Sequence, residues 1–280
     1  MKNVIAVLHI YKNGTTTLVD RYSHNKRFIY VRTSDEAILN HNSSSIPSTN
    51  VPLKVVAHYD PGILLGHGIT FDNLSLNSMQ SVKYVTILRN PIERMLSAYN
   101  YYLLELYTLW GRKASYVDFY TWFINKNRIL PTPCHYQYEH FITPRVDLLK
   151  KMYGGAVDNS PIMTDHKKEI NKVEQAWIDK QLHEDVNKAL ELVEENCAHV
   201  LFMDDDYINK FDQLVTKYEI NCTPNEEVKH THNTKADLKW IGRKYISYED
   251  LDEANKQLLK DHLKTEWFFY NRCKEIFSNE

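Results

Sequence analysis

The sequence predicts an α/β fold in which a central, largely parallel β-sheet is flanked by helices. One observation behind this prediction is the stretch Val4–Leu18, an apolar run that breaks at a Lys-Asn-Gly turn and continues as a helix start. Another is Val82–Leu88, a run rich in β-branched residues that leads directly into a strongly marked helix. Unbroken apolar runs are typical of strands buried on both faces of a parallel sheet, and alternation of strands with helices indicates the same architecture.

The composition bounds the organisation of the chain. Its 280 residues, of which 43% are hydrophobic and 25% charged, can form one sizeable core. We therefore treat residues 1–280 as a single domain, with a helical and loop insertion at about 110–198. The formal net charge of −2 argues against broad electrostatic binding to nucleic acid or to an anionic membrane, but it is compatible with a local basic cleft.

Cysteine usage and apolar segments give expectations about the compartment. The four cysteines are scattered and form no CxxC motif, so we expect isolated or reduced thiols, although two disulfides also fit the count. The N-terminal apolar run is too short for a signal peptide, and no stretch has the length and apolarity of a membrane span. We expect a soluble chain, cytoplasmic by default unless an anchor was trimmed away.

Local signals justify the elements of the first part of the chain. The threonines that follow Gly14 suit the start of a helix over Thr15–Tyr22. A Ser/Asn-rich segment, His41–Asn50, predicts a surface loop. The segment Ile63–Asp72 is an apolar run that continues into a histidine flanked by glycines. The strands predicted after the first one are Arg27–Val31, Leu53–His58 and Val82–Leu88.

The helix after Arg89 is the most strongly marked one. Asn90 suits the N-cap, Pro91 the first helical position, and Glu93 the N3 position of a capping box. Apolar residues then recur at helical spacing as far as Leu106. We therefore expect a well-capped helix that starts at the carboxyl end of a strand.

The rest of the chain predicts further helices, one short strand and two irregular segments. The irregular segments are Pro131–Pro144 and the polar loop Glu226–Ile241. Two helices come first, one over Tyr116–Asn125 and one from about six residues after Thr164 to about Asn196. A strand over His199–Met203 follows, and then a helix over Asp206–Tyr218 with Asp206 as its cap. A final helix opens at Ser247 with Asp250 at N3, and the residues expected on its buried side are Leu251, Ala254, Leu258, Leu259, Leu263, Trp267 and Phe268.

The turn after the first strand is a candidate anion site. A strand that turns through glycine into a helix presents free backbone amides at the positive end of the helix dipole. Lys12 adds a charge, and the threonines add donors that need no ionisation. The spacing fits neither GxxxxGK[ST] nor GxGxxG. An ordinary strand–turn–helix corner with a solvated lysine is the alternative interpretation.

A second candidate anion site lies at the end of Val82–Leu88. Arg89 follows this strand and precedes the capped helix, and Ser97 lies two turns along that helix, away from its apolar stripe. The hydroxyl of Ser97 could support an oxyanion held by Arg89. The alternative is that Arg89 pairs with a carboxylate and that Ser97 is a surface residue.

Together these stretches resemble the sulfotransferases that use 3′-phosphoadenosine 5′-phosphosulfate (PAPS). HIYKNGTTTL resembles their 5′-phosphosulfate loop, for example HIPKTGGTTL in the carbohydrate branch, although Asn13 and Thr15 replace the Thr and Gly of KTGGT. ILRNPIERMLSAY resembles their 3′-phosphate signature, in which a serine follows the arginine by eight residues. GHGITFD, LFMDDDYINKFDQLV and HNTKADLKW are similar to later segments of the glycosaminoglycan 2-O-sulfotransferase branch, but Leu65 stands where that branch often has a second histidine.

The resemblance implies a P-loop-like sulfotransferase fold and transfer of a sulfuryl group from PAPS to an acceptor hydroxyl, preferentially on a carbohydrate, with adenosine 3′,5′-bisphosphate as the product and no metal. It implies that Lys12 neutralises charge on the bridging oxygen and that His67 takes the acceptor proton. The residues that it assigns to PAPS are Lys12, Asn13, Gly14, Thr15, Thr16, Thr17, Arg89, Ser97, Thr234 and Lys235.

The choice of base leaves alternatives open. The unperturbed pKa of His67 is near neutrality, and its glycine neighbours permit close approach of a substrate. The alternatives are that His67 only forms a turn, that His58 is the base, or that a carboxylate serves instead. His9 lies in a predicted strand and is interpreted as a core residue. The acceptor is also open, since a small alcohol, a lipid or a tyrosine could replace a glycan.

Two other function classes compete with the transferase. A nucleotide-dependent kinase or NTPase would explain the P-loop-like turn, but GK[ST] is missing and Asp204 is the only Walker-B candidate. A non-catalytic nucleotide-binding module would keep the fold alone. The presence of both Lys12 and His67 favours an enzyme.

Overall fold

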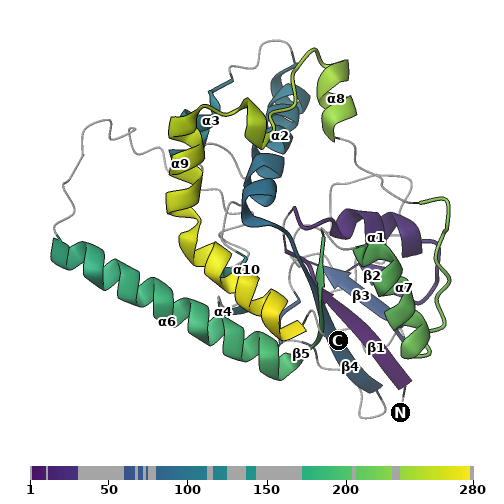
Figure 1. Ribbon diagram of the computed structural model, residues 1–280. Helices are drawn as coiled ribbons and strands as arrows, with labels where there is room; N and C mark the ends of the chain where they lie inside the picture. Colours follow the sequence, from purple (N-terminus) through teal and green to yellow (C-terminus); the bar gives the residue numbers. More distant parts are fainter. Residues whose placement is uncertain are drawn as a thin grey trace.

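In the part of the chain that the structure describes, five parallel strands form the central sheet in the order β2-β3-β1-β4-β5. This confirms the predicted α/β architecture with a parallel sheet flanked by helices (Figure 1). The central strand β1 pairs with β3 on one side and with β4 on the other. The strands are β1 (Lys2–Leu8), β2 (Phe28–Tyr30), β3 (Ile63–Gly66), β4 (Gln80–Leu88) and β5 (Cys197–Phe202).

The structure is a computed structural model that describes the residues of this sheet and of the helices named below. The residues that it describes are 2–10, 12–30, 60–66, 69–71, 74, 80–111, 116–124, 137–142, 172–203, 206–228 and 234–277, of which 109, 110, 124 and 172–182 are described by their backbone alone.

Each face of the sheet carries its own hydrophobic core. Side chains of β1 alternate between the two cores, because successive residues of a strand point to opposite faces: Ala6 belongs to one core, Ile5 and Val7 to the other. Helices α4 (Glu139–Ile142), α6 (Lys172–Asn196) and α10 (Lys264–Phe277) pack against the first face, and α1 (Thr15–Tyr22) and α7 (Tyr207–Lys217) against the second.

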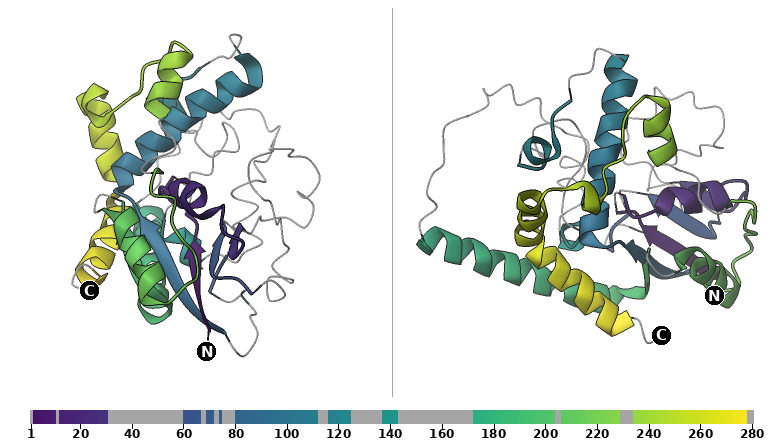
Figure 2. Two further views of the ribbon diagram at one scale, coloured as in Figure 1. Left: turned by 90° about the vertical axis from the view of Figure 1, so that its right-hand side faces the viewer. Right: turned by 45° about the horizontal axis from the view of Figure 1, so that its top comes forward.

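A third core lies beyond the carboxyl ends of the strands. It joins α2, which leads directly out of β4, to four smaller elements that stand beside it in Figure 2. The elements that form this core are α2 (Pro91–Trp110) and, beside it, α3 (Phe119–Ile124), α8 (Thr234–Trp240), the 3₁₀-helix η4 (Tyr248–Asp250) and α9 (Glu253–His262). The buried amide of Asn100 fixes α2 to the chain before η4, since it donates to the carbonyl oxygen of Ile246 at 2.8 Å and accepts from its amide at 2.8 Å.

The early elements agree with the sequence-based expectations except around β3. Helix α1 has the predicted bounds, and β2 lies within the predicted Arg27–Val31. The predicted strand Leu53–His58 lies outside the described residues. Strand β3 was not predicted, because four residues are too few to show a pattern, and its strand conformation comes from pairing with β1 and β2.

Two later expectations are wrong, and a third is correct in position alone. A short helix, α4, interrupts the segment expected to be irregular, and α8 lies inside the expected polar loop Glu226–Ile241. Asp206 occupies the cap position of α7, but its side chain caps no helix amide and instead accepts from the Asn209 amide group.

The expected final helix is two helices that meet at Leu263. The predicted capping box of Ser247 and Asp250 is present, but it opens η4. The break changes the phase of the second helix, so that Phe268, expected to be buried, is 41% exposed and Glu266 is fully buried. Ala254 is also exposed.

Two expectations about the whole chain can be compared with the described part. No helix there is both long and apolar enough to cross a membrane. The thiols of Cys197, Cys222 and Cys273 are free and buried, as expected of isolated cysteines, whereas Cys134 lies outside the described residues.

Candidate functional site

The carboxyl ends of β1 and β4 lie side by side. The two strands pair in parallel with Leu8 opposite Thr86, so the loops that follow them meet at the same edge of the sheet. The Nη1 atom of Arg89 donates to the carbonyl oxygen of Lys12 at 3.3 Å. The two stretches that the sequence singles out are therefore in direct contact.

The loop between β1 and α1 is open at its helix end. Lys12 and Gly14 are left-handed, with φ of 65° and 76°, and Gly14 stands at the N-cap position without a side-chain cap. The amides of Gly14, Thr15 and Thr16 donate to no acceptor in the described part of the chain. The buried hydroxyl of Thr15 also has no partner there. Uncompensated donors at the positive end of a helix dipole are suited to an anion.

The neighbouring amides are already in use. The amide of Asn13 donates to the carbonyl oxygen of Ile10 at 3.4 Å, and that of Thr17 to the carbonyl oxygen of Gly14 at 3.1 Å. Within the predicted binding residues 13–17, the amides available to a ligand are therefore the middle ones.

Helix α7 (Tyr207–Lys217) and the turn before it pack against this loop. The Tyr207 hydroxyl donates to the carbonyl oxygen of Gly14 at 3.1 Å. A Cβ atom added to Gly14 would lie 2.8 Å from that hydroxyl oxygen and 3.2 Å from the Met203 side chain. Both the backbone conformation and the close approach therefore require glycine.

The side chain of Asn13 serves the scaffold. It is fully buried, and its Nδ2 atom donates to the carbonyl oxygen of Ile87 at 2.6 Å and to Gln137 Oε1 at 2.7 Å. Gln137 in turn bonds the backbone of Arg89 twice, since its Oε1 accepts from the amide at 2.9 Å and its Nε2 donates to the carbonyl oxygen at 2.8 Å. One buried glutamine thus joins the ends of β1 and β4.

A buried ion pair between Arg94 and Glu266 holds the Gln137 side chain in place. Glu266 Oε1 accepts from Gln137 Nε2 at 2.9 Å, and the same carboxylate binds Arg94 through Nε at 3.0 Å and Nη2 at 3.3 Å. Arg94 and Glu266 are 1% and 0% exposed. Sequence reasoning missed Gln137, Arg94 and Glu266, because single polar residues in apolar or irregular stretches form no pattern.

The second strand end is closed by its own side chains. Asn90 Oδ1 accepts from the amides of Ile92 and Glu93 at 3.0 and 3.2 Å, which confirms the predicted cap. Glu93 does not complete a capping box; its carboxylate lies 3.7 Å from Arg89 and is half exposed. Ser97 lies two turns along α2, is 9% exposed, and its hydroxyl bonds none of the described residues.

Arg89 and Lys12 are two partly buried cations beside each other. Burial lowers the pKa of the Arg89 guanidinium from its usual value, and nearby carboxyl and phenol groups, including Glu93, partly oppose this effect. Burial and the adjacent Arg89 lower the pKa of Lys12 to about 8, whereas Glu105 raises it. Clustered, desolvated positive charge is stabilised by an anionic ligand.

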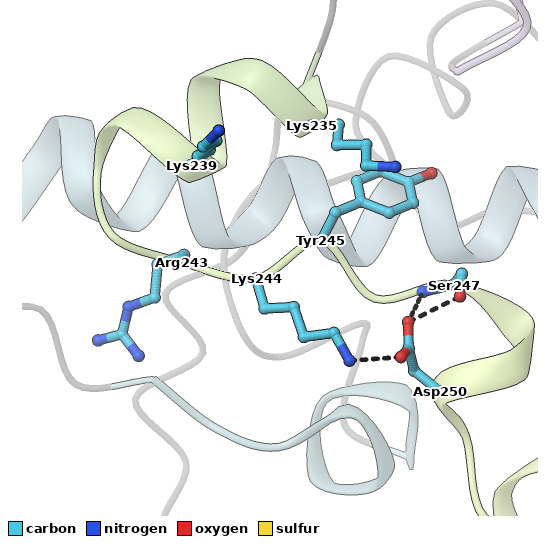
Figure 3. A pocket seen from close by; sticks show the side chains of 7 residues that line it. All are labelled: Lys235, Lys239, Arg243, Lys244, Tyr245, Ser247 and Asp250. Atoms are coloured by element: carbon cyan, nitrogen blue, oxygen red, sulfur yellow. Dashed lines mark hydrogen bonds and ion pairs between the residues drawn. The ribbon is translucent and has the colours of Figure 1, made fainter.

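A basic pocket of about 310 Å³ opens between α8 and η4 (Figure 3). Four cationic side chains line it, and Asp250, the acid among the lining residues, is paired with Lys244. Figure 3 shows Lys235 reaching from α8 toward the Tyr245 ring. The lining residues are Lys235, Lys239, Arg243, Lys244, Tyr245, Ser247 and Asp250.

Tyr245 links this pocket to Arg89. The Arg89 guanidinium lowers the pKa of the Tyr245 hydroxyl, although burial raises it more, so the two groups are close enough to interact. Of the predicted pair on α8, Lys235 lines the pocket and Thr234 starts the helix. The other cations of the pocket were missed, although the spacing of basic residues along 235–244 was a usable signal.

Other candidates lie away from this site or outside the described residues. His67, His58 and Asp204 are among the residues that the structure does not describe. His9 is buried, with its ring centroid 6.3 Å from that of Tyr30, as expected of a core histidine. Leu65 is fully buried in β3. No protein-family model and no curated protein matches this chain significantly.

Proposed function

We propose that this chain is a PAPS-dependent sulfotransferase that moves a sulfuryl group to an acceptor hydroxyl, preferentially on a carbohydrate. The observation that carries the proposal is the contact between an open, uncapped loop at Lys12 and the partly buried Arg89, which follow adjacent parallel strands. Two anion-binding ends held side by side suit a nucleotide that carries phosphate groups at both ends, because each end can neutralise one of them.

The loop after β1 would hold the 5′-phosphosulfate. The free amides of Gly14, Thr15 and Thr16 and the buried Thr15 hydroxyl supply neutral donors. Lys12 would neutralise the charge that develops on the bridging oxygen as the donor breaks. Preorganised donors and charge in a desolvated site are the main source of such stabilisation.

The end of β4 would hold the 3′-phosphate, which distinguishes PAPS from ATP. Arg89 supplies a guanidinium suited to phosphate, and Ser97 supplies a hydroxyl from α2, the helix that follows Arg89. The cations of the basic pocket, Lys235 among them, would add positive charge near Arg89, because Tyr245 lines the pocket and interacts with Arg89. Thr234 would contact the nucleotide from the start of α8.

The reaction would proceed in line. The acceptor oxygen forms a bond to sulfur while the bond from sulfur to the bridging oxygen breaks, and that electron pair stays on adenosine 3′,5′-bisphosphate. The acceptor proton passes to a base, for which we propose His67 because its ordinary pKa permits this role near neutral pH. The scheme assigns no role to a metal.

A thermal-shift comparison of adenosine 3′,5′-bisphosphate with ATP tests the donor assignment. We expect the bisphosphate to raise the melting temperature more than ATP does, without any need for Mg²⁺, because a ligand stabilises the folded state in proportion to its affinity. A larger, Mg²⁺-dependent shift with ATP would support the NTPase instead. Bisphosphate binding without transfer to any acceptor would support a non-catalytic module.

Transfer from labelled PAPS to a panel of acceptors tests the chemistry. The panel contains oligosaccharides, small alcohols, a lipid alcohol and a tyrosine peptide. Lys12→Ala should abolish transfer, and His67→Ala should abolish it with little effect on bisphosphate affinity. The exposed Lys188→Ala and His24→Ala are matched controls and should keep full turnover. Full turnover of His67→Ala would show that another group is the base.

A further inference from the structure

Two residues of α2 face Lys12, although the sequence marks neither. Tyr101 and Glu105 lie one helical turn apart, beyond Ser97 on the same helix. The Nζ atom of Lys12 lies 3.9 Å from the centroid of the Tyr101 ring, within the range of a cation–π interaction. The loop after β1 is therefore joined to α2 through its lysine.

Tyr101 and Glu105 also interact with each other. Their side chains form a hydrogen bond, in which the phenol donates and the carboxylate accepts. Residues four apart on a helix are neighbours on one face, so α2 presents both groups to the same side. The ring and the carboxylate thus act on the ammonium as one unit.

Burial and one neighbouring charge disfavour the ammonium of Lys12. Among the described residues, Arg89 from the end of β4 repels it, burial disfavours its charged form, and Glu105 is the acid that attracts it. An ammonium beside a guanidinium needs a compensating group to stay both in place and protonated before an anion binds. The phenol ring and the carboxylate of α2 provide that compensation.

We propose that Tyr101 and Glu105 are positioning residues that hold the Lys12 ammonium at the mouth of the β1–α1 loop and preserve its charge beside Arg89. The catalytic meaning of this pair rests on the proposed function. Its effect on Lys12 is a property of the protein without any substrate, so it can be measured separately.

The experiment measures the pKa of Lys12 from the pH dependence of its acetylation by trace reagent, followed by mass spectrometry of the Lys12 peptide. Glu105→Gln should lower this pKa by about one unit, the size of effect that one neighbouring charge produces. Lys12 would then react about tenfold faster at about pH 6, because only the neutral amine reacts. The exposed Glu194→Gln removes the same charge from α6 and should leave the pKa unchanged.

Two variants at Tyr101 separate the ring from the hydroxyl. Tyr101→Leu should lower the Lys12 pKa by about half a unit, the equivalent of a modest cation–π interaction. Tyr101→Phe keeps the ring and should lower it less. A wild-type pKa in either Glu105→Gln or Tyr101→Leu would overturn the proposal.

The same variants separate this proposal from the proposed function. If the chain transfers sulfate, the alkaline limb of its rate profile should move to lower pH in Glu105→Gln by the same amount as the Lys12 pKa. A shifted pKa in a protein that lacks transfer activity would leave the positioning pair intact and overturn the transferase alone. An unshifted pKa in an active transferase would overturn only the pair.

Discussion

The two strand ends of the site are built in opposite ways. At the end of β1, α1 starts at a left-handed glycine without a side-chain cap, and three successive amides are left without acceptors in the described chain. At the end of β4, Asn90 caps α2 and Gln137 binds both backbone groups of Arg89. The first end is open to a ligand, and the second is closed by the protein itself.

The difference teaches that similar strand–turn–helix units can offer an anion different groups. The open end offers backbone amides, which are fixed in position and carry no charge. The closed end uses its amides internally and offers the side chains of Arg89 and Ser97. The sequence already predicted backbone amides and Lys12 at the first end and the side chains of Arg89 and Ser97 at the second. The structure brings the two ends together, and anion binding at each stays a prediction.

The largest effect on stability is expected from removing Glu266, whose carboxylate binds the Gln137 side chain that joins both strand ends. Glu266→Ala would leave Arg94 charged and buried without its carboxylate partner Glu266, so we expect the free energy of unfolding to fall by roughly 3–5 kcal/mol. Glu275→Ala, on the same helix, removes an exposed partner of Arg272 and should cost less than about 1 kcal/mol. Urea unfolding of both variants measures the difference; equal costs would show that the buried pair does not support the site.

Gly14→Ala tests the open end directly. Gly242 is also left-handed, with φ of 73°, but an added Cβ there meets no atom within 4 Å, so it is a matched control for backbone strain. We expect Gly242→Ala to lower the unfolding free energy by about 1 kcal/mol. Gly14→Ala should cost about twice as much, because its Cβ also meets Tyr207, and it should abolish binding of adenosine 3′,5′-bisphosphate.

The pH dependence of bisphosphate affinity tests the charge at the open end. The pKa of Lys12 in the free protein is about 8, and a bound anion raises it. The affinity for the bisphosphate is then highest at pH values below that pKa. It falls as the pH rises through the pKa, by about tenfold between about pH 7 and 9. Isothermal titration over this range measures it. Lys12→Arg, which stays charged, should bind with the same affinity throughout; a decline there would assign the effect to another group.

Asn90→Ala sharpens the comparison at the closed end. Removal of an N-cap costs about 1 kcal/mol, and Asp252→Ala, which uncaps the distant α9, should cost about the same. Uncapping frees the first amides of α2. Because we assign anion binding at this end to side chains, bisphosphate affinity should change less than about twofold. A tenfold gain would show that these amides form an anion site that the cap normally blocks.

Much of the fold is predictable because it rests on local patterns. The apolar run of β1, the threonines of α1 and the Asn-Pro start of α2 each specify their element within a few residues. The polar helix α8 was missed because Leu238 is its one buried side chain, so its sequence shows no apolar stripe. The break at Leu263 was missed because apolar residues continue at helical spacing on both sides of it.

The support of the site could not be predicted, because it depends on contacts between distant residues. Gln137 lies 124 residues from Asn13 and 48 from Arg89 in the chain, and its neighbours give no sign of its burial. Tyr101 and Glu105 occupy ordinary helix positions, and only the packing of α2 beside the β1–α1 loop brings them to Lys12. Sequence patterns predicted which groups would contact a ligand but missed those that hold these groups in place.

The position of Glu266 in the chain has a consequence for synthesis. It lies 172 residues after Arg94 and 129 after Gln137, so its carboxylate leaves the ribosome long after the glycine turn near the N-terminus. Such distant contacts form late and slow down folding. A nascent chain that ends before residue 266 would carry the glycine turn but would lack the carboxylate that pairs with Arg94. Its maturation would have to wait until α10 is translated.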